Sequence, residues 1–225
     1  MIYLLLTIGV FLTYRQLFKP FHSPLANPLL FSILTIIALI LMFDINLLAY
    51  QQANKPFIWL LEPAVVALAI PLYQQMHLIR KHFTAIMVSC VVAVLLAIST
   101  GIGIAVLFHP TPDILLSLIP KSVTSPIAMS IAQNNGGIAS LAAAVVIAVG
   151  LFGALFGFSL FKFVGITDPK AQGLAMGAGA HAIGTAKALE VGEQQGAFSS
   201  LALVICGILT ALMSPFFVWL LTFLP

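Results

Sequence analysis

Two clusters of polar residues interrupt long apolar runs, and together they could hold a small anion. The first, Pro120-Lys121-Ser122-Val123-Thr124-Ser125-Pro126, lies inside the apolar run from Ile114 to Ile131. Proline removes a backbone donor and disfavours helix at the preceding residue, so this cluster predicts a helix break. Ser125-Pro126 then predicts a new helix start with Ser125 as N-cap. A helix start carries partial positive charge, and beside Lys121 it is typical of an anion site.

A second cluster repeats the first at a distance of 60 residues. His181-Ala182-Ile183-Gly184-Thr185-Ala186-Lys187 follows the glycine-rich segment from Gly173 to Gly179. With a shift of 60, Lys121 aligns with His181, and Ser125 aligns with Thr185. Paired interrupted segments at corresponding places predict the binding site of a transporter. Close helix packing would explain the glycines of the second cluster but not its charged and titratable residues.

These clusters supply the expected substrate-binding residues, which are Lys121, Ser122, Thr124, Ser125, His181, Gly184, Thr185 and Lys187. The hydroxyls and the backbone N–H groups of the helix starts would bind a carboxylate, and a lysine would supply charge. His181 and Glu62 are the candidates for proton coupling. Alternatives stay open for three of them. His181 could be a neutral residue bonded across helices, Lys187 could pair with Glu190 or Glu193, and Glu62 could lie at the interface.

The composition predicts a polytopic membrane protein. Of 225 residues, 61% are hydrophobic and 7% are charged, with a mean hydropathy of +1.15, which excludes a soluble domain. The net charge of +3 sits in loops and indicates topology, not nucleic-acid binding. Cys90 and Cys206 lie in apolar runs and predict no disulfide framework. The five histidines are scattered without ligand spacing, so we expect no metal and no cofactor.

The expected fold is all-α, a helical bundle of the inner membrane in a single transmembrane domain, residues 1–225. The expected spans are residues 2–14, 28–48, 56–76, 83–108, 138–162 and 198–222. Residues 2–14 are interpreted as a first membrane helix and not as a cleavable signal. Segments 113–135 and 171–195 are the interrupted ones, and each piece of about ten residues covers about half the hydrocarbon thickness. Residues 1–108 would form a scaffold, and residues 109–165 and 166–225 would form two interrupted-helix units.

The positions of positive charge favour re-entrant segments over full crossings. If segment 113–135 crosses the membrane, four loop Lys and Arg residues lie on the cytoplasmic side and three on the outer side. If it turns back, six lie on the cytoplasmic side and one on the outer side. Re-entrant segments would make the two units inverted, with their tips meeting at the midplane. Full crossing by helices that unwind at the midplane is the alternative.

Both clusters make the chain resemble the LrgB/CidB family. The resemblance covers nearly everything from Asn27 onward, and it includes Asn27 to Leu30, Pro63 to Tyr73, Gly196 to Ala202 and Cys206 to Thr210. Ser125 stands where the family often has Thr, which keeps a capping hydroxyl. Lys187 stands where Arg is usual, which keeps the charge but loses bidentate geometry. Glu62 is not a residue that we associate with the family.

The resemblance implies two functions. Bacterial members are named as holin-like or antiholin-like proteins that modulate murein hydrolase export and cell lysis, usually with a small LrgA/CidA-type membrane protein. Plastid relatives look like glycolate/glycerate translocators, and some bacterial members are linked to pyruvate uptake. A lytic pore needs many copies and a wide lumen, whereas capped half-helices with Lys121 and His181 suit a small monocarboxylate.

We therefore expect a secondary transporter of small monocarboxylates of the glycolate, glycerate, lactate or pyruvate type, with proton coupling as an option, and a holin-like oligomeric protein as the alternative. An intramembrane hydrolase using Ser122 or Ser125 with His181 is disfavoured, because a serine before proline makes a poor nucleophile elbow and no acid orients the histidine. No enzyme activity is expected. The expected partners are a small carboxylate, membrane lipid, an LrgA/CidA-like protein and a second copy of the chain, as a dimer. The expected location is the bacterial cytoplasmic membrane.

Overall fold

The structure is a computed structural model that describes residues 2–20, 27–67, 69–74 and 76–221, and the regular elements in these ranges are all helices. The expectation of an all-α fold is confirmed. Contacts divide the chain into two compact units, Met1–Ala67 and Leu68–Pro225. The functional division into a scaffold and two interrupted-helix units stays a prediction.

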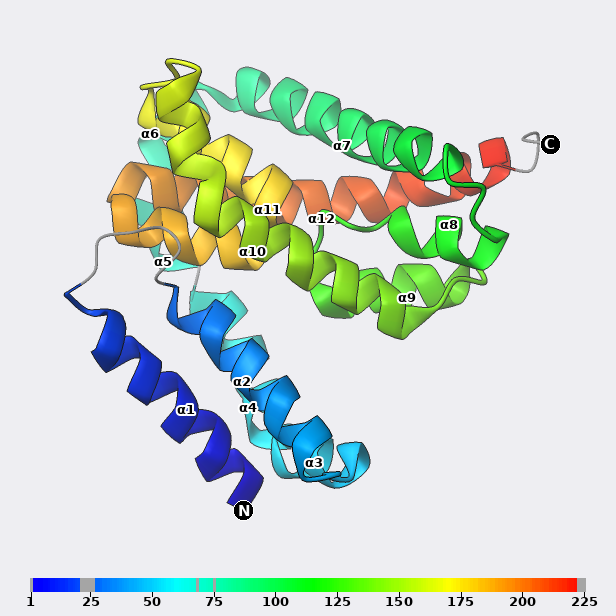
Figure 1. Ribbon diagram of the computed structural model, residues 1–225. Helices are drawn as coiled ribbons and strands as arrows, with labels where there is room; N and C mark the ends of the chain where they lie inside the picture. The colour runs from blue at the N-terminus through cyan, green and yellow to red at the C-terminus, as the bar shows by residue number, and fades with distance from the viewer. Residues whose placement is uncertain (1, 21–26, 68, 75, 222–225) are drawn as a thin grey trace. The chain divides into compact units, whose positions relative to one another are not determined.

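The first unit contains α1 (Ile2–Phe18), α2 (Pro28–Met42), α3 (Leu47–Ala53) and α4 (Lys55–Ala67) (Figure 1). Asn27 caps α2 by accepting from the N–H groups of the two residues after Pro28, which occupies the first helical position. The predicted span 28–48 ends early, because the chain turns after α2 and Asn46 caps the separate helix α3. The α1 helix runs past the predicted end at residue 14.

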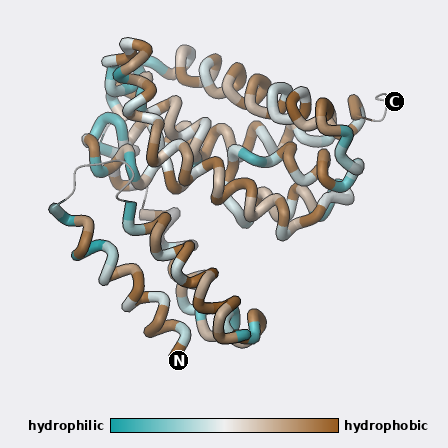
Figure 2. The backbone as a smooth tube through the Cα atoms, viewed as in Figure 1, coloured by the Kyte–Doolittle hydropathy of each residue, from teal (hydrophilic) through white to brown (hydrophobic). Residues whose placement is uncertain are grey.

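The second unit begins with the short helices α5 (Ala69–Gln74) and α6 (Met76–Lys81). Its long helices are α7 (Phe83–Val106), α10 (Ala139–Phe163) and α12 (Glu193–Leu221). Within the described ranges, these three are long and apolar enough to cross a membrane (Figure 2). They correspond to the predicted spans 83–108, 138–162 and 198–222. The predicted span 56–76 includes residues 68 and 75, which lie outside the described residues.

The main core of the second unit lies between α7 and α12, which run side by side (Figure 1). The buried residues of α7 recur every four positions at Ile86, Cys90, Val94 and Ile98, so they form one helix face. The α12 helix contributes residues such as Phe198 and Cys206 to this core. This pair of helices forms the frame against which the interrupted segments pack.

The chain after the first interrupted segment returns to the last turn of α8. The helices α8 (Pro112–Leu118) and α9 (Ser125–Asn134) are separated by a non-helical turn, as the sequence predicts. After α9 the N–H of Ile138 donates to the side-chain oxygen of Ser117 at 2.7 Å. These residues are 21 positions apart, and a continuous helix of that length would separate them by roughly 30 Å. The hydrogen bond therefore closes a loop that contains all of α9.

The second interrupted segment also folds back. The helix α11 (Pro169–Val191) contains a sharp kink at His181, which divides it into a first half, 169–180, and a second half, 182–191. A methyl group added at Gly184 would lie 2.8 Å from the carbonyl oxygen of Met176. Eight residues of straight helix would separate these positions by about 12 Å. Met176 also shares an apolar cluster with Ala188, so the second half packs along the first.

Candidate functional site

The kink in α11 depends on an unusual backbone conformation at His181. Its φ of 41° and ψ of −133° lie outside the helical region, and a positive φ is uncommon for a residue with a side chain. Such a residue costs about 1 to 3 kcal/mol and persists only where the surrounding structure holds it in place. His181 is 2% exposed, so the fold buries a strained and polar residue together.

The His181 ring is fixed at one nitrogen and free at the other. Nε2 lies 2.7 Å from the carbonyl oxygen of Val146 on α10. A carbonyl oxygen can only accept, so Nε2 carries a hydrogen and donates it. Nδ1 is buried and has no partner among the described residues. Neutral His181 would therefore accept a hydrogen bond at Nδ1 from a bound hydroxyl or carboxylic acid, and protonated His181 would donate one to a carboxylate.

Gly150 of α10 makes room for this ring. A methyl group added there would lie 2.5 Å from Cε1 and 2.7 Å from Nε2 of His181. Carbon atoms in favourable contact are about 3.5 to 4.0 Å apart, so only glycine leaves space at this position. Gly150 thus lets the His181 ring lie flat on α10, and the hydrogen bond to the Val146 carbonyl of the same helix fixes the ring there.

Lys121 lies in the turn between α8 and α9, where the sequence predicts a break. Its side chain crosses α7 at Gly101, since a methyl group added to Gly101 would lie 2.6 Å from Lys121 Cε. In the described part of the chain no hydrogen bond or ion pair holds the Lys121 ammonium. A partly buried and unpaired ammonium in an apolar bundle is expensive, and such groups in membranes are typically functional.

The two interruptions approach the same part of α10. Val123, in the turn beside Lys121, is fully buried in an apolar cluster that includes Ala142 and Val146. Val146 is the residue whose carbonyl oxygen binds the His181 ring. Side chains from both interruptions therefore converge on one turn of α10.

The start of α9 is uncapped. The helix begins at Ser125, and its N-cap is Thr124 with an extended conformation, φ −71° and ψ 151°. The prediction of Ser125 as N-cap is therefore wrong by one residue, because Ser125 already has helical geometry. The Thr124 side chain makes no capping hydrogen bond. The first N–H groups of α9 are therefore left for water or a ligand.

The comparisons with known proteins agree with this architecture in placing the chain among membrane proteins. The LrgB-like family model matches residues 7–220. The chain belongs to the LrgB-like family.

Relatives of this LrgB-like chain match along nearly its whole length. Uncharacterized protein YxaC of Bacillus subtilis is 37% identical over 97% of this chain and 95% of its own length. Holin-like protein CidB of Staphylococcus epidermidis is 30% identical over 94% of this chain and 93% of its own length. An uncharacterized protein of Haemophilus influenzae is 35% identical over 96% of this chain and 93% of its own. No solved structure matches significantly. With its long apolar helices, the LrgB-like chain is a multi-pass bacterial membrane protein.

The other predicted site residues of this LrgB-like chain occupy different surroundings. Ser122, like Ser125, is partly buried near Lys121, and no hydrogen bond to His181 joins either serine in the described structure. Thr185 is buried, and its hydroxyl lies 2.9 Å from that of Ser199 on α12. Gly184 is buried where the second half of α11 meets the first.

Lys187 lies apart from the buried residues. Its Nζ is 2.9 Å from a carboxylate oxygen of Glu190, and 42% of its side chain is exposed. This is the pairing that the sequence left open as the alternative to substrate contact. The side chain of Glu62 lies outside the described part of the structure.

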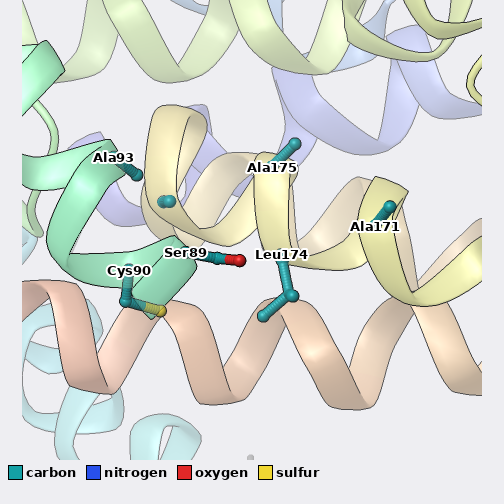
Figure 3. Close-up of a pocket in the computed structure, with 7 residues that line it drawn as sticks. Ser89, Cys90, Ala93, Ala171, Leu174 and Ala175 are labelled. Carbon is teal, nitrogen blue, oxygen red and sulfur yellow. The ribbon is translucent and has the colours of Figure 1, made fainter. Parts of the chain in front are cut away.

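A separate cavity of about 260 Å³ opens between α7 and the first half of α11 (Figure 3). Its walls are mostly small apolar side chains, with Ser89 and Cys90 contributed by α7. Neither Lys121 nor His181 lines this cavity. Among the described residues, no group of three or more His, Cys, Asp or Glu side chains could hold a metal ion.

Sequence reasoning missed the residues that position the site. Val146 contributes a backbone carbonyl, which no side-chain pattern reveals. Ser199 is one of two adjacent serines in α12, and only the fold shows which one meets Thr185. Gly101 belongs to the small-residue pattern Thr100-Gly101-x-Gly103, which is typical of helix packing, but the pattern does not say that Lys121 packs there.

Proposed function

We propose that this protein is a carrier of small monocarboxylates, of the 2-hydroxy or 2-keto acid type. The observation that carries the proposal is the His181 ring, which is buried on a strained backbone with Nδ1 unpartnered. A buried polar atom without a partner costs about 1 to 3 kcal/mol, so its persistence supports a ligand that completes it.

The proposed site uses Lys121 for charge and His181 Nδ1 for a directed hydrogen bond. Lys121 would bind the carboxylate, together with the uncapped N–H groups at the start of α9. His181 would bind the 2-hydroxyl or 2-keto group, or carry a coupled proton. Ser122, Thr124 and Ser125 stay candidates for further hydrogen bonds. Gly184 and Thr185 would shape the kink, and Lys187 lies outside the proposed site because it pairs with Glu190.

We further propose that both interrupted segments are re-entrant and belong to an inverted repeat. The fold-back of each segment supports this, through Ser117 with Ile138 in the first and Gly184 with Met176 in the second. The shift of 60 supports it too. At this shift Ser117 aligns with Gly177. Both residues lie against the chain that follows their segment: Ser117 bonds to Ile138, and a methyl group added at Gly177 would overlap the Ser199 carbonyl.

Uptake by proteoliposomes tests the proposal. Radiolabelled glycolate, glycerate, lactate and pyruvate would be offered to vesicles containing the purified protein. Lys121→Gln removes the charge at the proposed site, and Lys187→Gln is the matched control, because it removes an equal charge from an exposed ion pair. A lost hydrogen bond to a charged group costs about 1.5 to 3 kcal/mol, so KM should rise roughly 10- to 100-fold in the first variant only.

A variant at the kink tests the ring separately. His181→Gly tolerates a positive φ and removes the imidazole together with Cβ, so the fold should survive while uptake is lost. Absence of uptake for all four acids by the unaltered protein would overturn the carrier proposal. Equal changes of KM in Lys121→Gln and Lys187→Gln would exclude the proposed binding site at Lys121.

The second candidate is a holin-like oligomeric membrane protein that modulates murein hydrolase export and lysis. The names of the curated relatives favour this function over the first, since several are called holin-like protein CidB. A homo-oligomer, with a dimer as its simplest form, and a small LrgA/CidA-like partner belong to this proposal. Leakage of dyes of several sizes from vesicles, unchanged by Lys121→Gln, is the result that distinguishes it from a carrier.

A further inference from the structure

A groove of about 490 Å³ runs along α9 on the side that faces α12. Pro126 and Ile127 line one end, at the start of α9, and Asn135 lines the other, just after the helix ends. The α9 helix has 10 residues and is thus about 15 Å long, which is half of the hydrocarbon thickness. The groove therefore has the length needed to join a membrane surface to the membrane interior.

The walls of the groove are mainly apolar, but they carry polar side chains that do not suit lipid. Ser130 and Asn134 extend from α9 into it, one turn apart, and neither side chain has a hydrogen-bond partner among the residues that the structure describes. An amide facing lipid tails would lose its hydrogen bonds to water, at a cost of several kcal/mol. Water or a polar solute is therefore a better occupant of this groove than an acyl chain.

The α12 wall of the groove is mainly apolar but contains one hydroxyl and one freed backbone carbonyl. Pro215 has no N–H, so it leaves the carbonyl of Ala211 without its usual helical donor. The Ser214 hydroxyl donates to that carbonyl at 3.2 Å instead. All three residues line the groove, so both of its walls carry hydrogen-bonding groups.

The inner end of the groove meets the electropositive start of α9. Pro126 lies directly after the uncapped Thr124-Ser125 start, and Lys121 lies in the preceding turn. An anion in the groove would thus move toward increasing positive potential. Charge complementarity favours a small carboxylate over a cation or a neutral lipid as the solute.

We propose that the groove between α9 and α12 is a water-filled path by which the small carboxylate reaches Lys121 from the membrane surface where α9 ends. The path rests on the carrier function proposed above and adds the route of access. Ser130 and Asn134 replace part of the anion's hydration shell as it passes, and Lys121 receives it at the helix start.

Cysteine substitution tests the path directly. Ser130→Cys and Asn134→Cys place a thiol in the groove, and Met129→Cys is the matched control, since Met129 is 40% exposed on another face of the same helix. The native Cys90 and Cys206 are each 1% exposed and should stay unlabelled. The probe is a charged methanethiosulfonate that does not cross membranes, applied to vesicles of known orientation.

The two groove thiols should react roughly tenfold faster than the control thiol, because only a thiol in contact with water ionises readily. Reaction at residue 130 or 134 should also block uptake and be slowed by the carried acid. Groove thiols that react no faster than Met129→Cys would overturn the path, as would full uptake after complete labelling. If the unmodified protein takes up none of the acids, the carrier function is overturned, and the labelling rates still decide whether the groove holds water.

Discussion

Replacing Gly101 with alanine should move the Lys121 ammonium without harming the fold. The new methyl group would lie 2.6 Å from Lys121 Cε and 3.2 Å from Cδ. Carbon atoms need about 3.5 to 4.0 Å, so Cε must move by about 1 Å. A lysine side chain is flexible near its end, so it can move without a shift of the backbone.

The same substitution should leave the protein as stable or make it more stable. Alanine is favoured over glycine inside a helix by about 0.5 to 1 kcal/mol, and Gly101 lies within α7. A misplacement of about 1 Å in a binding site can cost as much as roughly 100-fold in rate. We therefore expect KM for the carried acid to rise about 10- to 100-fold while the thermal unfolding temperature is unchanged or higher.

Gly103→Ala is the matched control. It lies on the same helix, and apart from the neighbouring residues and the nearby backbone of α7 no atom is within 4 Å of the methyl group it would add. It should give the same gain in stability with no change in uptake. Uptake would be measured in proteoliposomes and unfolding in detergent, for both variants in parallel. If Gly101→Ala and Gly103→Ala show the same KM, the position of Lys121 does not matter for binding, and the reasoning is refuted.

Three further substitutions test the elements that hold the site. Gly150→Ala should push the His181 ring off its carbonyl partner, because the added methyl would lie 2.5 Å from Cε1; we expect uptake to be lost, and unchanged uptake would contradict the assigned role of the ring. Thr185→Val should cost about 1 to 3 kcal/mol in unfolding free energy by leaving the Ser199 hydroxyl unpartnered. Adding Ser199→Ala should recover part of that cost in a double-mutant cycle, and strictly additive losses would argue against the hydrogen bond. Ser117→Ala should lower the unfolding temperature by removing the bond that closes the first interrupted segment, and hydrogen exchange should show faster opening of α9; unaltered exchange would show that the bond contributes little.

The sequence was sufficient to predict the main helices and both interruptions. Long apolar runs predict α7, α10 and α12 within a few residues, since lipid leaves few alternatives for an uninterrupted apolar segment. The prolines on either side of Lys121 predict the break between α8 and α9, because proline acts locally on the backbone.

The parts that failed depend on contacts between distant residues. The second interruption was predicted within residues 171–195, but the positive φ at His181 was not, because both adjacent residues are alanine. The short helix α3 was missed, because a seven-residue helix carries too little periodicity to detect. The hydrogen bonds from His181 to Val146 and from Thr185 to Ser199 join different helices, so no local pattern predicts them.

The brevity of α8 and α9 limits how the protein can be made. With 7 and 10 residues, neither helix is close to the roughly 20 residues that a lone segment needs to partition into lipid. The α9 helix packs on α10, which the ribosome synthesises later. Residues 125–138 must therefore wait in the translocation channel, or at the membrane surface, until α10 has entered the bilayer.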